Sequence, residues 1–184
     1  MLTVTVVLSA ALQIGVASGQ VDTDPKAVEI PQTLRTTLRS HPAIKECLEY
    51  EHLPLEKILS VSRFEPIQPR YQTVLAEGLL PCLSGNVNHL ILLYVLIGKD
   101  WHKVLDETGA KLERLPSATR GWRHLTLWQH SSAFESLNLS YQFDGTEYKP
   151  VSCKEVEFAD PSTGNPHPKP KSVPCTWDWK PRRK

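Results

Sequence analysis

Apolar residues between positions 30 and 48 recur at helical spacing. Ile30, Leu34 and Leu38 lie four residues apart, and Ile44, Cys47 and Leu48 share a second stripe. This spacing is typical of one face of a helix. Pro42 favours a second helix start, because the first helical position does not need the N–H that proline lacks. The pattern predicts a helical hairpin or a bent helix over residues 31–51.

Beyond Pro54, short apolar runs alternate with turn residues, which is typical of β-strands. The candidate strands are residues 58–64, 72–76, 90–97, 102–105, 111–115, 124–129, 137–143 and 148–153. The run 90–97 is apolar almost throughout and too short to span a bilayer, so we expect a central strand buried on both faces. We predict an α+β domain over residues 30–159. In it, a short N-terminal helical segment packs on an antiparallel β meander of about six strands.

The most regular alternation of apolar and polar residues lies near the end of this domain. Its apolar members are Leu137, Leu139, Tyr141 and Phe143. Asp144-Gly145 follows, a pair that suits a two-residue hairpin turn with positive φ angles. That turn would place Tyr141 opposite Tyr148 as an aromatic pair. Pro150 lacks an N–H, so its strand should be at an edge or an end there.

The first 21 residues carry no charged side chain. An apolar stretch over residues 4–16 precedes Ala17, Ser18 and Gly19, which predicts a secretory signal peptide over residues 1–19. An uncleaved anchor is the alternative, because no Lys or Arg precedes the stretch. Polar residues make the stretch less hydrophobic than a typical membrane span, so we expect no stable membrane insertion after cleavage. We expect residues 20–29 to be flexible and the protein to be periplasmic or extracellular.

The four cysteines are Cys47, Cys82, Cys153 and Cys175. An exported chain meets an oxidising compartment, so we expect disulfides. No two cysteines have the C-x-x-C spacing of a redox or zinc motif. Three pairings are possible, and we favour Cys153 with Cys175, which would tie the tail to the domain and leave Cys47 with Cys82.

Residues 160–184 contain six prolines and are expected to form a tail rather than a domain. The Pro-Lys alternation over 167–171 predicts extended polyproline II with a solvated backbone. The whole chain has a formal net charge of +1, so we expect no nucleic-acid partner. The histidines show no ligand spacing, so we expect no metal and no cofactor.

Three motifs follow one another in the second half of the chain. They are Gly-Trp-Arg-His-Leu at 121–125, His-Ser-Ser-Ala-Phe-Glu at 130–135 and Tyr-Gln-Phe-Asp-Gly-Thr-Glu-Tyr at 141–148, with Cys153 after them. In this order they resemble a group of small exported bacterial proteins without an assigned function. The resemblance covers about residues 90–153 and implies a shared fold but no activity. One departure is His124, where the resembled pattern more often has Asp.

Alternation over residues 124–129 sets Leu125 and Leu127 on one face of a strand and Trp128 on the other. Aromatic and arginine side chains are common anchors of binding surfaces, and Arg120 lies near these residues. We predict a non-catalytic binding module for an envelope protein or a cell-wall glycan. Its candidate binding residues are Trp122, Arg123, Trp128, His130, Ser132 and Glu135. The alternative is that the N-terminal helices cover this face and the tryptophans belong to the core.

A second functional hypothesis is a cell-envelope hydrolase that uses the loop of residues 130–135. His130, Ser131 and Ser132, with Asp144 nearby in sequence, supply the residue types of a nucleophilic triad. Neighbours on one loop rarely point at each other, however, and the chain has no G-x-S-x-G elbow. We therefore favour a polar loop whose side chains cap backbone groups.

Overall fold

The structure is a computed structural model, and it describes residues 29–85, 87–160 and 162–175. Three helices come first: α1 (Gln32–Arg39), α2 (Pro42–Glu51) and α3 (Leu55–Ile58). Nine strands follow: β1 (Leu59–Arg63), β2 (Gln72–Gly78), β3 (His89–Ile97), β4 (Asp100–Gly109), β5 (Lys111–Thr119), β6 (Trp122–His130), β7 (Glu135–Phe143), β8 (Tyr148–Ala159) and β9 (Pro166–Pro174). The expected signal peptide lies outside the described residues.

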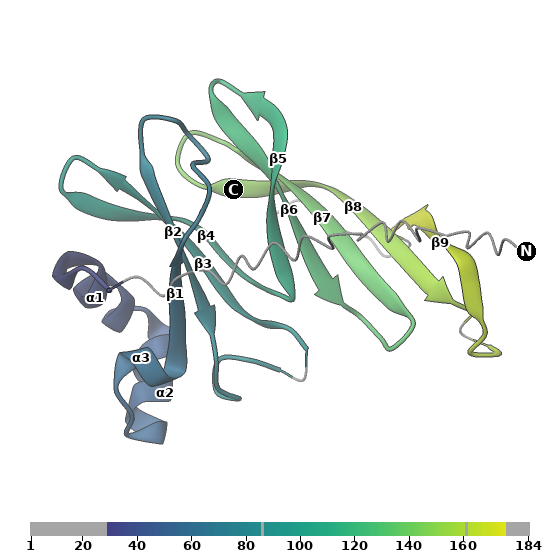
Figure 1. Cartoon of the computed structure of the whole chain (residues 1–184), viewed down its shortest axis with the longest axis horizontal. Helices are drawn as coiled ribbons and strands as arrows, with labels where there is room; N and C mark the ends of the chain where they lie inside the picture. The colour runs from purple at the N-terminus through teal and green to yellow at the C-terminus, as the bar shows by residue number, and fades with distance from the viewer. Residues whose placement is uncertain (1–28, 86, 161, 176–184) are drawn as a thin grey trace, which may run out of the picture.

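The strands form two antiparallel sheets in chain order, β1-β2-β3-β4 and β5-β6-β7-β8-β9 (Figure 1). The predicted helices and the antiparallel meander are confirmed, and every candidate strand overlaps an observed one. The expected number of about six strands was too low. It assumed one sheet of ordinary size, whereas the meander divides at the β4–β5 connection into two sheets that pack on each other.

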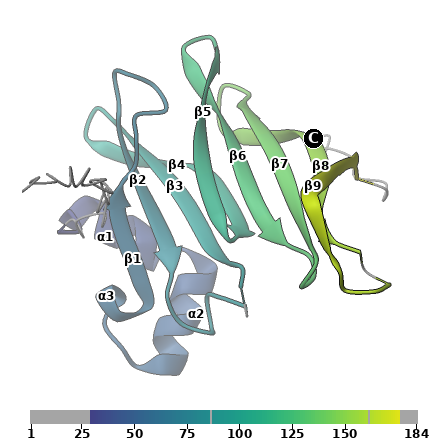
Figure 2. The ribbon, with the colours of Figure 1, turned by 45° about the vertical axis from the view of Figure 1, so that its right-hand side comes forward.

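Two hydrophobic clusters divide the molecule into three layers. The first joins the helices to one face of the first sheet and includes Leu34, Ile44 and Leu92. The second lies between the two sheets and includes Leu93 and Leu125. In both views the helices lie against β1–β4 and away from β5–β9 (Figure 1, Figure 2). Strand β3 contributes to both clusters, which confirms the prediction of a central strand buried on both faces.

The β7–β8 hairpin has a four-residue connection, so the predicted two-residue turn was wrong. Phe143 pairs with Tyr148, and Tyr141 pairs with Pro150 rather than with Tyr148. The Asp144 carboxylate accepts hydrogen bonds from the backbone N–H groups of Thr146 (2.8 Å) and Glu147 (3.0 Å). An aspartate whose side chain accepts hydrogen bonds from the next backbone N–H groups stabilises this four-residue turn. The Asp-Gly pair alone does not distinguish it from a two-residue turn.

The segment 166–174 is strand β9, which corrects the expected polyproline II conformation. It pairs antiparallel with β8, from Lys154 opposite Pro174 to Ala159 opposite Pro166, so part of its backbone is hydrogen-bonded. Prolines are tolerated because β9 is the edge strand of its sheet. The pairing begins after Pro150, so β8 has a free edge at that proline, as predicted.

Both favoured disulfides are present: Cys47–Cys82 and Cys153–Cys175. The first joins α2 to the β2–β3 connection, and the second joins β8 to the residue that follows β9. Each sheet therefore has its own covalent link. Two such bonds are typical of proteins outside the reducing cytoplasm.

Candidate functional site

Four aromatic rings from different elements meet at one end of the sandwich. Trp122 and Phe143 are stacked, with ring centroids 3.8 Å apart and planes at 15°. Tyr71 lies 5.8 Å from Trp122, and Tyr148 lies 5.5 Å from Phe143. We call these four residues the aromatic stack. The stack adjoins the cluster between the sheets, so sheet packing determines where these rings stand.

The β5–β6 turn positions Trp122 in the aromatic stack. Thr119 pairs with Trp122, so Arg120 and Gly121 form a two-residue turn. Both have positive φ, 52° and 83°, as a type I′ hairpin turn requires. Glycine and asparagine are the residues that accept this conformation readily. Arginine at the first position costs on the order of 1 kcal/mol of backbone strain.

Three of the four residues of the aromatic stack line a cavity of about 420 Å³, within the size range of small-ligand sites. Tyr71, Trp122 and Phe143 supply aromatic wall, and His102 and Arg120 supply polar groups. The lining comes from the β1–β2 connection, strands β3 and β4, and the β5–β6 and β7–β8 turns with the adjoining ends of β5, β6 and β7. An apolar hollow with a few polar groups is the usual form of a ligand site.

A second cavity, of about 530 Å³, shares Arg120 with the first. Arg70 and Arg123 also line it, together with Gln68 and small or apolar residues, and none of its lining residues is acidic. Arg123 is anchored through its backbone, because its N–H donates to the Ile67 carbonyl (2.7 Å). The cavity is therefore strongly basic.

The Arg123 carbonyl is the hydrogen-bond acceptor for Tyr148, whose hydroxyl donates at 2.7 Å. Burial raises the pKa of Tyr148, so this tyrosine remains a neutral donor at physiological pH. The aromatic stack and the arginine cavity are thus joined by a hydrogen bond as well as by the shared Arg120.

The two tryptophans of β6, both candidate binding residues, have different surroundings. Trp122 packs against the cluster between the sheets. Trp128 lies on the opposite face from Leu127, where its indole N–H donates to the Glu113 carboxylate (3.2 Å). The helices pack on the first sheet, so the alternative in which they cover this face is wrong. Trp122 does contact the core, and Trp128 is half-buried on the outer face of the second sheet.

Polar contacts surround Trp128 on this outer face. The hydrogen bond from Lys111, opposed by partial burial and assisted by the Trp128 N–H, lowers the pKa of Glu113. Thr126 donates to the Asn138 side chain (2.9 Å) on the neighbouring strand. Such cross-strand pairs satisfy the polar groups of a solvent-facing sheet.

The loop that follows β6 is closed by its own hydrogen bonds. The N–H groups of Ser131 and Ser132 both donate to the Glu135 carbonyl at 3.2 Å. The Ser132 hydroxyl accepts from the Phe134 N–H (3.1 Å) and donates to the Glu135 carboxylate (3.3 Å). This arrangement agrees with the expectation of a capping loop. The length of β6 between Trp122 and His130 is about 26 Å. His130, Ser132 and Glu135 therefore lie at the far end of the strand and do not join the site at Trp122.

His130 is held away from the two loop serines. Its backbone N–H and carbonyl pair with the Asn88 side chain at 2.9 Å and 2.8 Å. Its ring contacts Ser136 (Nδ1 to Oγ, 3.3 Å), a buried serine of β7 that is only 3 % exposed. His130 itself is exposed and lines neither cavity described above. The nucleophile-and-base arrangement of a hydrolase in a cleft is not formed by these residues.

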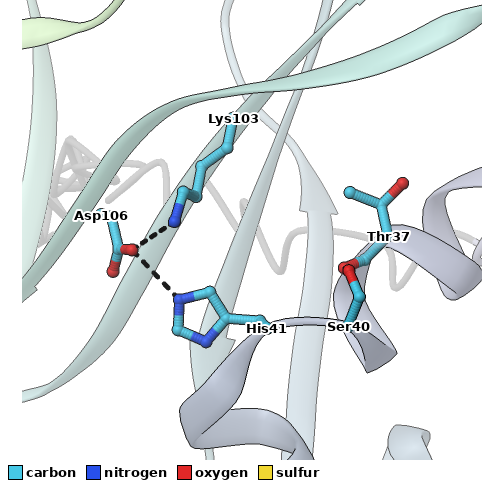
Figure 3. Close-up of polar contacts among 5 residues, drawn as sticks. All are labelled: Thr37, Ser40, His41, Lys103 and Asp106. Atoms are coloured by element: carbon cyan, nitrogen blue, oxygen red, sulfur yellow. Dashed lines mark hydrogen bonds and ion pairs between the residues drawn. The ribbon is translucent and has the colours of Figure 1, made fainter.

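A polar cluster that the sequence did not reveal joins the helices to the first sheet (Figure 3). His41, between α1 and α2, contacts Asp106 of β4 (Nε2 to Oδ2, 3.1 Å), and Lys103 forms an ion pair with the same carboxylate. Burial raises the pKa of Asp106, but the bonds from Lys103 and His41 outweigh it and lower the pKa overall. His41 Nδ1 is buried without a hydrogen-bond partner. The cluster fixes the helical layer on β4.

Among residues 29–85, 87–160 and 162–175, no three His, Cys, Asp or Glu side chains are grouped so that they could bind a metal ion. No helix within these ranges has the length and apolar character needed to cross a membrane. No known protein family, curated protein or solved structure matches this chain.

Trp122 and Arg123, predicted from the sequence as binding residues, line these cavities, and Tyr71 and Arg70 were not among the predicted residues. A local signal did exist. In both segments an arginine and an aromatic residue lie beside a turn residue: Arg70 and Tyr71 follow Pro69, and Arg120 and Trp122 flank Gly121. Only the packing of the two sheets brings these segments together, since Tyr71 and Trp122 are 51 positions apart.

Proposed function

We propose that this protein is a non-catalytic binding module outside the cytoplasm and that its ligand is a glycan held at the aromatic stack. The observation that supports this most strongly is the stacked Trp122–Phe143 pair in the wall of a 420 Å³ cavity. Aromatic rings offer a large, rigid contact area, and they pack well on the C–H face of a sugar ring. His102 and Arg120 can donate hydrogen bonds to hydroxyl groups at the rim.

A glycan fits these features better than a protein partner does. Protein interfaces need a broad patch of contiguous surface, whereas the aromatic side chains here are gathered in a hollow. The large apolar side chains that are more than a third exposed include Tyr50, Val87, Phe134 and Val151, which belong to different elements. The site therefore has the dimensions of one or two sugar units rather than of a protein docking face.

The hydrolase hypothesis has less support. The Ser132 hydroxyl is engaged with Phe134 and Glu135, and the His130 ring contacts Ser136 instead of a loop serine. Hydrolysis would require a nucleophile or an acid beside His130 in a cleft that admits substrate. We therefore place the ligand at the aromatic stack.

The proposal is tested by binding of the mature protein to a printed array of bacterial and plant oligosaccharides. We expect Trp122→Ala to abolish capture of every glycan that the unaltered protein binds. Trp128→Ala is the matched control, since it removes the same side chain from the other end of the same strand and should leave binding within about twofold. Circular dichroism establishes that both variants fold. Retained binding by Trp122→Ala, or loss with Trp128→Ala alone, would place the site elsewhere.

A further inference from the structure

Three arginines line the second cavity, and they come from segments that are distant in sequence. Arg70 belongs to the β1–β2 connection, Arg120 to the β5–β6 turn and Arg123 to β6. Guanidinium groups around one hollow repel one another, and the lining contains no Asp or Glu to offset that repulsion. Such a site is favourable for an anion.

Two other arginines of the described chain, Arg35 and Arg114, are used differently. Arg35 forms an ion pair with Glu56, and Arg114 forms one with Glu65. None of the ion pairs found among the described residues includes Arg70, Arg120 or Arg123. The arginine cavity therefore differs from the surface ion pairs, whose charges are already compensated.

The cavity is a constructed feature of the fold. The Gln68 side chain accepts from the Arg70 N–H (2.7 Å), and the Gln68 carbonyl accepts from the Tyr71 N–H (3.0 Å). The Ile67 carbonyl then binds the N–H of Arg123, which connects this segment to β6. The Arg123 guanidinium donates to the Pro116 carbonyl, which restrains its orientation. Hydrogen bonds thus hold the connection that carries Arg70 and Tyr71 beside β6.

Backbone strain at Arg120 is a second, independent observation. Arg120 adopts φ 52° in a turn whose first position favours asparagine or glycine. Strained residues persist only where the surrounding structure holds them, and they cluster at functional sites such as ligand clamps. Arg120 is also the residue that lines both cavities, the one with the aromatic side chains and the one with the other two arginines.

We propose that the glycan is acidic. Its sugar ring packs on the aromatic stack, and its anionic substituent, a carboxylate, sulfate or phosphate, binds in the arginine cavity. This inference rests on the proposed function and adds the chemical class of the ligand. Arginine is the side chain best suited to such groups, because its planar fork donates two parallel hydrogen bonds to an oxyanion. The shared Arg120 makes the two parts of the site adjacent, so one residue of an acidic sugar can occupy both.

The decisive variant is Arg120→Asn. Asn-Gly is a favoured type I′ turn, so the variant should fold with an unchanged or higher midpoint of thermal unfolding. Binding of acidic oligosaccharides should weaken about tenfold to a hundredfold, the usual range for losing a charge-assisted hydrogen bond. Arg70→Gln should weaken it in the same direction. Arg63→Gln, which removes an exposed arginine of β1 outside both cavities, is the control and should change nothing.

The probes are oligosaccharides of equal length in neutral, carboxylated, sulfated and phosphorylated forms, on the same array and then by calorimetry. A preference for one or more acidic forms that disappears in Arg120→Asn supports the inference and identifies the anion. Affinity for the acidic form should also fall as sodium chloride is raised. Inorganic sulfate and phosphate, tested by thermal shift, should stabilise the unaltered protein more than Arg120→Asn.

The possible failures can be told apart. Equal capture of neutral and acidic forms, with Trp122→Ala still inactive, would overturn the acidic-ligand inference and leave the glycan-binding proposal in place. An acidic preference that survives in both Arg120→Asn and Arg70→Gln would overturn the assignment to the arginine cavity. Capture of no oligosaccharide on the array would overturn both proposals together.

Discussion

The two sheets of this protein differ in how many of their faces are covered. The first sheet is packed on one face by the helices and on the other by the second sheet, so residues 90–95 of β3 are all buried. The second sheet contributes to a hydrophobic cluster from the face that carries Leu125 and Leu127. Its other face carries Trp128 together with exposed residues such as Ser152 and Lys154. Most side chains of the first sheet pack against other layers, and the second sheet with its turns supplies more of the residues that line the candidate ligand site.

The position of the candidate site follows from this difference. Sheet packing brings the ends of β6 and β7 against the β1–β2 connection, where side chains are only partly covered. Burial there is enough to order Trp122 and Phe143 without removing them from solvent. A ligand site therefore forms at the margin of the interface between the sheets rather than on either sheet alone.

The largest expected contrast concerns the two disulfides, one between α2 and the β2–β3 connection and one between β8 and the residue after β9. Replacing Cys47 and Cys82 with alanine should lower the free energy of unfolding by about 4 kcal/mol, because the bond closes a loop across a separation of 35 residues. Replacing Cys153 and Cys175 should cost much less globally, because β9 pairs only with β8 and can detach alone. Urea unfolding measures the first effect, and hydrogen exchange over residues 166–174 measures the second. Equal global losses would mean that β9 unfolds only with the whole domain.

The next contrast compares the tryptophans at the two ends of β6. Trp122→Ala should lower the free energy of unfolding by about 2–3 kcal/mol, since it removes a half-buried ring stacked on Phe143. Trp128→Ala should cost about 1 kcal/mol, because it removes one hydrogen bond and a half-exposed ring from the outer face. Urea unfolding of both variants, with Trp122→Phe as a ring-preserving control, gives the two values. A larger loss for Trp128→Ala would contradict the assignment of faces.

A smaller effect tests the polar attachment of the helices to the first sheet. The lowered pKa of Asp106 means that its carboxylate stabilises the fold above the unfolded pKa of about 3.9, and this contribution is lost as pH falls through the lower folded value. The Asp106 side chain is 39 % exposed, so solvent screening keeps the contribution below about 1 kcal/mol.

Asp106→Asn should therefore be less stable than the unaltered protein at pH 7, and the difference should shrink near pH 3. Urea unfolding at both pH values measures it, with Asp100→Asn at the exposed start of β4 as the control. A difference that does not change with pH would show that the carboxylate charge is not its source.

The smallest effect is expected on the outer face of the second sheet. Glu113→Gln removes the ion pair with Lys111 but leaves an oxygen that can accept the Trp128 N–H. The change in the free energy of unfolding should be within about 0.5 kcal/mol, as for most exposed ion pairs. Chemical denaturation with tryptophan fluorescence as the signal checks this value. A loss above about 1 kcal/mol would mean that the outer face is more tightly packed than its exposure implies.

Several features could be read from local patterns. Helical spacing between Ile30 and Leu48 predicted α1 and α2, and the apolar run 90–97 predicted a strand buried on both sides. The β7–β8 hairpin shows the limit of such reading, because both turn lengths keep the same alternation of faces. Its register depends on whether Asp144 binds the backbone that follows it, a choice between competing local hydrogen bonds.

By itself, the amino-acid sequence determined most of the helical and strand segments and the buried character of β3, and it predicted disulfides with three possible pairings. These follow from periodicity and from the chemistry of an oxidising compartment, and both are local or compositional. Tertiary structure alone decided that the meander divides into two packed sheets, that residues 166–174 join the second sheet and that Tyr71 and Arg70 meet β6. Each of these depends on contacts between segments far apart in the chain, and the free energy of such contacts depends on how whole sheets pack rather than on any short stretch of sequence.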